Sequence, residues 1–179
     1  MAKYDTVIFD LDGTLTNSEK GICACAAYAL EKMSREVPAY ETLRRFIGPP
    51  LADSFAQYCH MDEEETALAV AYYRERYLPI GWRENQVYPG IRALLAMLKE
   101  QGTRVLVATG KPLLPTRRIL EYFDLMQYIS GIAAPTDEDP RADKKLLIER
   151  LAANEPLGYA VMIGDRVTDI TGAMEAGIK

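Results

Sequence analysis

The chain has 179 residues, which is enough for one large hydrophobic core or two small ones. Hydrophobic residues make up 49% of it and charged residues 26%, which is typical of globular proteins and excludes collagen-like, low-complexity and disordered classes. Lys and Arg number 21 and Asp and Glu number 26, so the net charge is −5. Because an acidic chain neutralises phosphates poorly, we expect no nucleic-acid partner.

Membrane and redox signals are weak. The longest uninterrupted apolar run, residues 22–30, is much shorter than a membrane span, and the apolar stretch at the N-terminus is too short for a signal peptide. The three cysteines have no zinc-type or CxxC spacing, so we interpret them as reduced core thiols. The single histidine, His60, argues against histidine-based catalysis. We expect a cytoplasmic protein with no membrane partner.

The first element in chain order is a short buried strand. Residues 4–9 are mostly apolar and end abruptly at the sequence DLDGT, residues 10–14. After this turn the pattern becomes helical for a long stretch, and no strand is readable between residues 16 and 87. The helices predicted in this stretch cover residues 17–33, 39–46, 51–58 and 62–76.

From Pro89 onward, strands alternate with helices. The predicted strands cover residues 104–108, 128–133 and 159–163. The predicted helices cover residues 90–101, 112–123 and 144–153. This alternation indicates an α/β protein with a Rossmann-like parallel sheet and helices on both faces. We therefore predict two domains: a core from residues 1–15 and 86–179, and an inserted all-helical domain from residues 16–85.

Charged and hydroxyl side chains gather at one edge of the predicted sheet. Ligands of open parallel sheets bind beyond the carboxyl ends of the strands. Each residue alone is commonly a helix cap or a turn former, but together they indicate a site. Those that follow a strand or lie at the start of the helix predicted at residues 144–153 are Asp10, Asp12, Thr109, Gly110, Lys111, Lys144, Lys145, Asp165 and Asp169.

The four carboxylates would repel one another at close range, so the cluster predicts a bound cation. Carboxylate oxygens without Cys or His favour Mg²⁺, which binds a few carboxylates together with water and substrate phosphate. Asp10 and Asp12 can both face the site if the chain stays extended through Leu11. One carboxylate can then act as a nucleophile and the other can transfer a proton. Gly13 allows a sharp turn with exposed amides.

Four features, in their order along the chain, resemble the four motifs of the haloacid dehalogenase (HAD) superfamily. They are DLDGT, the strand end at Thr109, a lysine at a helix start, and GDRVTD. The helical insertion resembles the C1 cap of that superfamily. The sequence FIGPPL, residues 46–51, resembles its phosphoglycolate-phosphatase-like branch. The resemblance covers essentially the whole chain. It implies an Mg²⁺-dependent phosphatase that hydrolyses a small phosphorylated metabolite through an aspartyl-phosphate intermediate.

The resemblance implies a role for each motif residue. Asp10 would be the nucleophile and Asp12 the general acid/base. Thr109 would hydrogen-bond the transferring phosphoryl group. Lys144 would neutralise charge between the nucleophile and the phosphate, with Lys145 as the less favoured alternative because Leu147 and Ile148 follow Lys144 at the family spacing.

The same resemblance implies the metal and substrate contacts. The implied metal residues are Asp10, Asp12 through its backbone carbonyl, Asp165 and, in a supporting role, Asp169. The implied substrate-binding residues are Gly13, Thr14, Gly110, Lys111, Phe46 and Leu51, the last two in a loop that Pro49-Pro50 stiffens.

Several activities stay open within this superfamily. Phosphoglycolate, 5'-nucleoside monophosphates and sugar phosphates are candidate substrates, so the protein could be a 5'-nucleotidase or a sugar-phosphate phosphatase, and a phosphomutase shares the same core residues. Asp12 argues against a dehalogenase, which normally lacks this second aspartate. Lys20 and Lys32 are not in a convincing setting for a phosphonatase lysine. The alternative from a different class, a phospho-acceptor signalling domain, does not account for the helical insertion after the first strand.

The end of the chain carries a further expectation. Relatives in this superfamily usually continue with another strand and helix after a Gly-Ile pair such as residues 177–178. We therefore expect the strand at residues 159–163 to be an edge of the sheet, and the chain to be a shortened form of a longer protein. We also expect a monomer or a weak homodimer.

Overall fold

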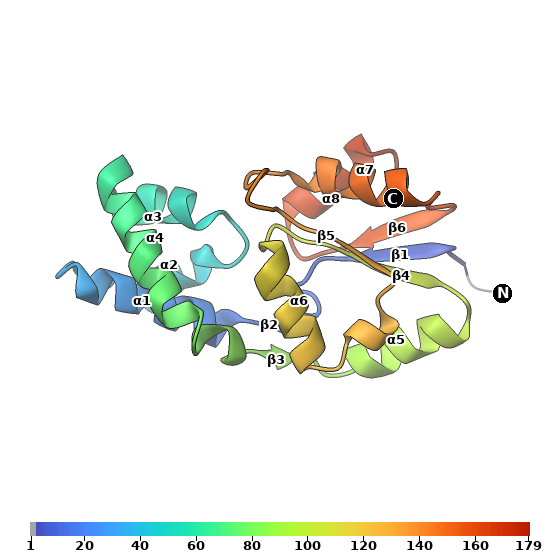
Figure 1. The fold of residues 1–179 in the computed structure, drawn as a ribbon, viewed down its shortest axis with the longest axis horizontal. Helices are drawn as coiled ribbons and strands as arrows, with labels where there is room; N and C mark the ends of the chain where they lie inside the picture. Colours follow the sequence, from blue (N-terminus) through green and yellow to red (C-terminus); the bar gives the residue numbers. More distant parts are fainter. Residues whose placement is uncertain (1–2) are drawn as a thin grey trace. The chain divides into compact units, whose positions relative to one another are not determined.

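The computed structural model describes residues 3–179, which divide into two compact units (Figure 1). The core unit consists of Met1–Thr16 and Val87–Lys179, and the helical unit of Asn17–Gln86. The boundaries expected from the sequence, after residues 15 and 85, lie one residue earlier in each case. The helical unit is thus inserted directly after the first strand and its turn.

A four-stranded parallel sheet forms the centre of the core unit, with the strand order β5-β4-β1-β6. Its strands are β1 (Thr6–Phe9), β4 (Arg104–Ala108), β5 (Gly131–Ala133) and β6 (Ala160–Ile163). Strand β1 pairs with β4 on one side and with β6 on the other, and all of its residues are buried. Burial on both faces is typical of a central parallel strand. The predicted α/β class is confirmed.

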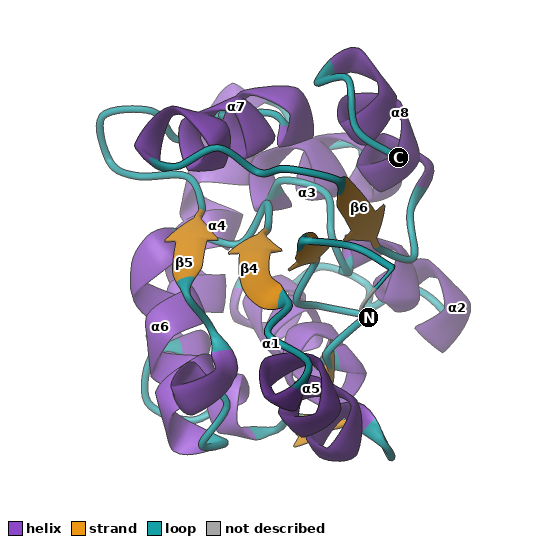
Figure 2. Ribbon diagram, turned by 90° about the vertical axis from the view of Figure 1, so that its right-hand side faces the viewer, coloured by secondary structure: helices purple, strands orange, loops and turns teal. Residues whose placement is uncertain are grey.

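Helices cover both faces of this sheet, with α7 and α8 on one face and α5 and α6 on the other (Figure 1, Figure 2). Their bounds are α5 (Ile91–Glu100), α6 (Leu113–Tyr122), α7 (Lys144–Asn154) and α8 (Val167–Glu175). Under α7 and α8, the side chains of Ile8, Leu106, Leu147 and Ala173 belong to one buried cluster. Because the strands are parallel, the segments that follow β1, β4 and β6 emerge at the same edge of the sheet.

Strand β6 is an edge of the sheet, as the sequence predicts. On its outer side, the Met162 amide donates a hydrogen bond to the Lys179 carbonyl at 2.7 Å. At the opposite edge, the strand predicted at residues 128–133 is shorter than expected. The residues Met126–Tyr128 form a 3₁₀ helix (η3), closed by a hydrogen bond from the Tyr128 amide to the Leu125 carbonyl, so β5 begins only at Gly131.

The helical unit consists of four α-helices and two 3₁₀ turns. These are α1 (Glu19–Lys32), α2 (Tyr40–Leu43), η1 (Arg44–Phe46), α3 (Leu51–Cys59), α4 (Glu63–Tyr77) and η2 (Gly81–Arg83). The N-terminus of α4 carries a capping box, in which Asp62 accepts a hydrogen bond from the Glu65 amide at 2.9 Å and Glu65 accepts one from the Asp62 amide at 3.2 Å. None of the helices in residues 3–179 is long and apolar enough to cross a membrane.

Two short strands were missed by the sequence prediction. Strands β2 (Thr16–Asn17) and β3 (Gln86–Val87) pair with each other where the chain passes between the units. Each has two residues, and a segment of this length is too short to show the alternation that identifies a strand. The expectation of no strand between residues 16 and 87 was therefore wrong at both ends of that stretch.

The position of Phe46 does not match the expectation that it contacts a substrate. Its side chain is 1% exposed, and its ring packs edge-on against Phe55 and tilted against Tyr58, with centroid distances of 4.9 Å and 5.9 Å. Leu51, from the same predicted loop, is the first residue of α3 and is half-buried. We interpret Phe46 as a core residue of the helical unit.

This interpretation predicts a stability effect for Phe46→Ala. Removing a buried aromatic ring leaves a cavity and costs about 3–5 kcal/mol. The control is Leu68→Ala, because Leu68 is 47% exposed and its truncation should change the free energy of unfolding by about 0.5 kcal/mol or less. Denaturant unfolding followed by circular dichroism measures both. Equal losses in the two variants would contradict the placement of Phe46 in the core.

Candidate active site

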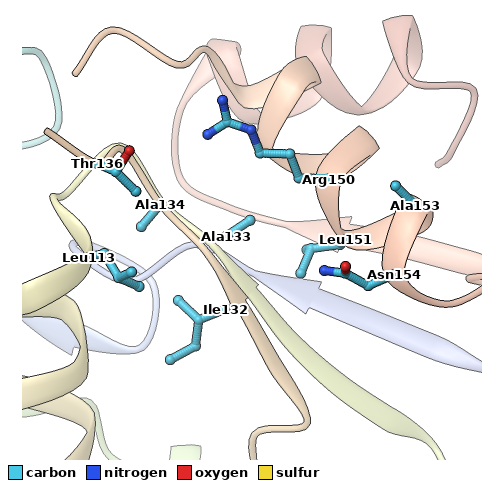
Figure 3. Close-up of a pocket in the computed structure, with 9 residues that line it drawn as sticks. All are labelled: Leu113, Ile132, Ala133, Ala134, Thr136, Arg150, Leu151, Ala153 and Asn154. Carbon is cyan, nitrogen blue, oxygen red and sulfur yellow. The ribbon is translucent and has the colours of Figure 1, made fainter. Parts of the chain in front are cut away.

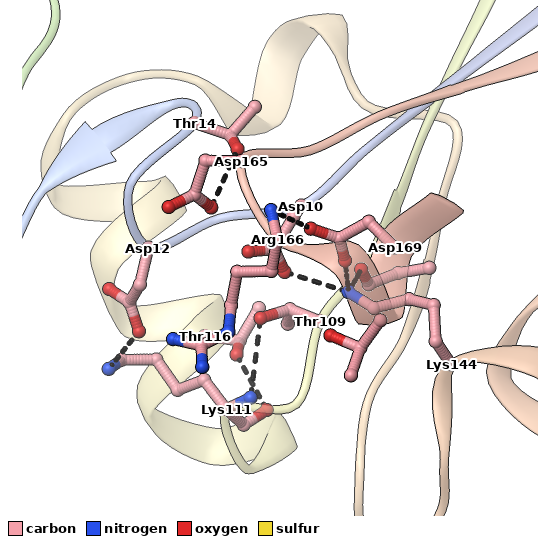
Figure 4. A network of polar contacts seen from close by, with 12 residues as sticks. Asp10, Asp12, Thr14, Thr109, Lys111, Thr116, Lys144, Asp165, Arg166 and Asp169 are labelled. Carbon is pink, nitrogen blue, oxygen red and sulfur yellow. Dashed lines mark hydrogen bonds and ion pairs between the residues drawn. The ribbon is translucent and has the colours of Figure 1, made fainter. Parts of the chain in front are cut away.

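Three loops that follow strands of the core unit, together with the first turn of α7, gather the polar residues shown in Figure 4. The loops are residues 10–14 after β1, 109–111 after β4 and 164–166 after β6, and Asp169 follows in the first turn of α8. Asp10, Asp12, Thr109 and Asp169 are each at most 6% exposed. Charged groups are rarely buried to this degree unless they are paired, so their partners define the site.

Lys144, the first residue of α7, is the central cation of the site. Its Nζ lies 2.9 Å from Asp10 Oδ1 and 2.8 Å from Asp169 Oδ1, and it donates a hydrogen bond to the Ala108 carbonyl at 2.6 Å. Lys145, by contrast, has a side chain that is 43% exposed. Of the two lysines between which the sequence left a choice, Lys144 is the one that contacts Asp10.

Local sequence explains why Lys144 is held at this point. Asp143 caps α7 by accepting a hydrogen bond from the Leu146 amide at 2.8 Å, which fixes where the helix begins. Helix α8 approaches this first turn at Gly172. A Cβ atom at Gly172 would lie 2.6 Å from Lys144 Cβ and 3.0 Å from the Lys145 amide nitrogen. Only a glycine allows the two helices to pack so closely.

Two further glycines make room for carboxylates. Gly13 has φ +90°, a conformation that favours glycine, and a Cβ atom there would lie 2.5 Å from Asp165 Oδ2. A Cβ atom at Gly164 would lie 2.1 Å from Asp169 Oδ2. The glycines of the DLDGT and GDRVTD sequences therefore permit close approach of the acidic side chains to the backbone.

The acidic residues offer an oxygen-only site for a metal ion. One carboxylate oxygen from each of Asp10, Asp165 and Asp169 lies within 4.8 Å of the other two. In Asp169, both oxygens already have partners, because Oδ1 pairs with Lys144 and Oδ2 accepts a hydrogen bond from the Arg166 amide at 3.1 Å. Asp165 is exposed. This donor set fits a hard divalent cation bound by Asp10 and Asp165, with Asp169 engaged in holding Lys144.

The environment of Asp10 disfavours its charged form. Burial raises the pKa of Asp10 above its ordinary value, and the nearby charges of Asp169 and Asp12 raise it further, while Lys144 partly offsets these effects. A divalent cation beside Asp10 would act in the same direction as Lys144. Cations at this site thus favour the carboxylate form, which is the form that can attack an electrophile.

Asp12 contacts a different cation. Lys111 Nζ lies 2.6 Å from Asp12 Oδ2, and both side chains are 8% exposed. The other oxygen, Oδ1, is buried and has no hydrogen-bond partner within the described residues. Leu11, between the two aspartates, is fully buried. The two aspartates therefore lie in one site but are paired with different lysines (Figure 4).

The remaining predicted residues divide between the two units. In the core unit, the Thr14 hydroxyl donates to Asp165 Oδ1 at 3.4 Å, and Thr109 Oγ1 accepts from the Lys111 amide at 3.2 Å. Gly110 is exposed beside them. The residues Phe46 and Leu51 belong to the helical unit.

Two contributors were missed by reasoning from the sequence. Gly172 lies against Lys144, and the hydroxyl of Thr116 in α6 donates to the Lys111 carbonyl at 3.1 Å. Neither residue lies in a motif, because each acts through a contact between elements that the sequence does not reveal. Arg166, whose side chain is drawn among the site residues in Figure 4, lies within GDRVTD and could have been found from that sequence.

A cleft of about 350 Å³ lies elsewhere in the core unit, beside β5 (Figure 3). Its lining includes Leu113 of α6, Ile132 of β5 and Leu151 of α7. None of the charged residues of the site lines it. The chemistry of the core unit is therefore concentrated at the strand ends rather than in this cleft.

Comparisons with known proteins agree with the motifs. A family model described as haloacid dehalogenase-like hydrolase matches residues 7–179. The chain is 37% identical over 178 residues to a 5'-nucleotidase from Pseudomonas aeruginosa, covering 98% of this chain and 80% of that protein. It is also 37% identical over 174 residues to the tyrosine-protein kinase PtkA of Mycobacterium tuberculosis, covering 96% of this chain and 59% of that protein. The crystal structure of a predicted phosphatase from Clostridium acetobutylicum superposes with a TM-score of 0.90 at 38% identity, covering 99% of this chain and 83% of that one.

The contact at Gly172 predicts the effect of Gly172→Ala. The added methyl group would lie 2.6 Å from Lys144 Cβ, so α8 or the first turn of α7 must move. We expect a loss of about 1–3 kcal/mol in the free energy of unfolding, as for other overpacked positions, and a longer distance between Lys144 Nζ and Asp10. Chemical unfolding and a crystal structure of the variant measure these changes.

The control for this variant is Thr171→Ala, one residue earlier on the same helix, where the side chain is exposed. We expect a change of about 0.5 kcal/mol or less. A Gly172→Ala variant that keeps both the stability and the Lys144–Asp10 pair would show that the close approach of the helices is not required.

Proposed function

This chain belongs to the haloacid dehalogenase-like hydrolases and is a phosphomonoester hydrolase, and from that premise we propose that it transfers a phosphoryl group from a small metabolite to Asp10 and then to water. The observation that carries the proposal is the buried arrangement in which Lys144 pairs with both Asp10 and Asp169, beside Asp165. A nucleophile, a cation and a metal-binding group are thus available at one point.

In the first step we assign the nucleophile to Asp10. A carboxylate oxygen of Asp10 forms a bond to phosphorus while the bond between phosphorus and the leaving oxygen of the substrate breaks. Asp12 gives its proton to that leaving oxygen, so the alcohol departs neutral. In the second step a water molecule attacks phosphorus and gives a proton to Asp12, the bond between phosphorus and Asp10 breaks, and inorganic phosphate leaves.

Catalysis of this reaction depends mainly on positioning and on neutralisation of spread negative charge. We assign that neutralisation to the Lys144 ammonium, with the Thr109 hydroxyl hydrogen-bonding the phosphoryl oxygens. Asp10, Asp165 and the backbone carbonyl of Asp12 would hold Mg²⁺, which when bound supplies further positive charge beside the phosphoryl group. Asp169 would keep Lys144 in place rather than act as a direct ligand.

For the substrate we propose a 5'-nucleoside monophosphate. The support is the P. aeruginosa relative named as a 5'-nucleotidase, which this chain matches over 98% of its length. The sequence FIGPPL favours phosphoglycolate instead, but it is a short segment, and its Phe46 ring is buried in the helical unit. Phosphoglycolate and sugar phosphates are therefore the comparison substrates in the test.

The nucleophile assignment predicts the effect of Asp10→Asn. The amide keeps the size of the carboxylate but cannot attack phosphorus, so phosphate release should fall by about 10³-fold or more. The control is Asp137→Asn, because Asp137 is exposed and lies outside the site. Release of inorganic phosphate from the three substrate classes, with Mg²⁺ present, measures both variants. Activity retained by Asp10→Asn would contradict the mechanism.

The same assay also tests the class of reaction. Transfer of phosphate from ATP to a tyrosine-containing peptide, with no phosphate released from any monoester, would contradict hydrolysis. That result would match the name of the kinase relative instead.

The metal assignment predicts dependence on Mg²⁺. EDTA should abolish phosphate release and Mg²⁺ should restore it, whereas Ca²⁺ should substitute poorly because its coordination is larger and less regular. Because we expect Mg²⁺ to bind only to the folded protein, adding it should also raise the midpoint of thermal unfolding of the wild-type protein. Asp165→Ala should lose most of that increase. Full activity in EDTA would contradict the proposed metal site.

A further inference from the structure

The two carboxylate oxygens of Asp12 are in different surroundings. Oδ2 is paired with Lys111 Nζ at 2.6 Å, and both side chains are 8% exposed. Oδ1 is buried and, among residues 3–179, has no hydrogen-bond partner. A buried oxygen without a partner is costly, so its presence indicates a group that the protein itself does not supply. One oxygen is thus held in place while the other is left for a ligand.

Lys111 is in turn fixed by its own backbone. Its amide donates to Thr109 Oγ1 at 3.2 Å, and its carbonyl accepts from Thr116 Oγ1 at 3.1 Å. Thr116 is fully buried in α6, and Thr109 is buried at the end of β4. The backbone of Lys111 is therefore bonded within its own loop to Thr109, which directly follows β4, and to Thr116 of α6. These bonds restrict the position from which its side chain reaches Asp12.

We propose that Lys111 is the positioning residue for proton transfer by Asp12, an inference that rests on the proposed function. The ion pair at Oδ2 fixes the rotation of the Asp12 carboxyl group and leaves Oδ1 for the reacting oxygen. In the first step the proton passes from Oδ1 to the leaving oxygen of the phosphomonoester. In the second step the proton of the attacking water passes to Oδ1. Lys111 neither gains nor loses a proton in either step.

This role separates Lys111 from the chemistry at Asp10. The ammonium that contacts Asp10 belongs to Lys144, and the two lysines occupy separate ion pairs. Without Lys111, Asp10 still has its cation and can attack a substrate whose leaving group needs no proton. Para-nitrophenyl phosphate is such a substrate, because nitrophenolate leaves as an anion. Hydrolysis of the aspartyl phosphate still needs Asp12, so only this later step should slow.

The experiment compares the two steps in Lys111→Met, which keeps the length of the side chain without the charge. Rapid mixing with para-nitrophenyl phosphate and Mg²⁺ should give a burst of nitrophenolate, about one per enzyme, at a rate close to the wild-type rate. Steady-state turnover should then be about 10²-fold slower than in the wild type, within the range that acid–base catalysis contributes. Intact-mass spectrometry should show that phosphorylated protein accumulates.

Two further variants make the test independent of a folding defect in Lys111→Met. Lys111→Arg keeps a cation that can pair with Asp12 Oδ2, so it should recover most of the steady-state rate. Thr116→Val removes the hydrogen bond to the Lys111 carbonyl and should give the same separation of burst and turnover, with a smaller effect. Lys99→Met is the control, because Lys99 lies in the last turn of α5 and donates a hydrogen bond to the Gln127 carbonyl, outside the site.

The outcomes distinguish this inference from the proposed function. Equal slowing of burst and turnover in Lys111→Met would overturn the inference, since it would mean that Lys111 neutralises the transferring phosphoryl group. Unchanged turnover in that variant would also overturn it while leaving the hydrolase mechanism intact. A wild-type protein that neither forms phosphorylated protein nor releases nitrophenolate would overturn the proposed function itself.

Discussion

The buried ion pairs of Lys144 are the interaction on which the rest of the core unit depends. Removing a charged group from water is expensive, and the cost is offset only while each charge keeps its partners. Lys144 begins α7, Asp10 directly follows β1, and Asp169 lies in the first turn of α8, so three segments must be held within hydrogen-bond distance of one ammonium group. The close packing at Gly172 and the cap at Asp143 both serve this requirement.

A second ion pair, between Lys111 and Asp12, divides the site into two parts. Lys144, at the start of α7, pairs with Asp10, and Lys111, in the loop after β4, pairs with Asp12. The two aspartates, only two residues apart, therefore have different ionic partners. The proposed mechanism assigns an attacking oxygen to Asp10 and proton transfer to Asp12, and these two roles require different surroundings.

The sequence was sufficient to predict most of this site because parallel topology places strand ends together. In the observed order β5-β4-β1-β6, strands β1 and β6 are neighbours, so the acidic residues that follow them lie close together. What the sequence could not reveal depends on contacts between elements. Packing determines three such features, and no local sequence pattern predicts them. They are the burial of Phe46, the contact of Gly172 with Lys144 and the pairing of Lys111 with Asp12. The two-residue strands β2 and β3 are too short for any periodicity to show.

The ion pair between Lys144 and Asp10 also acts on the charge of Asp10, the proposed nucleophile. Burial raises the pKa of Asp10, which works against the carboxylate form that a nucleophile needs, and the negative charges of Asp169 and Asp12 add to that effect. Lys144 opposes it from 2.9 Å. Because Lys144 also neutralises Asp169, one ammonium both reduces the repulsion that Asp10 experiences and attracts its negative charge. Any change that moves Lys144 should therefore alter the packing of α7 and α8 and the charge state of Asp10 together.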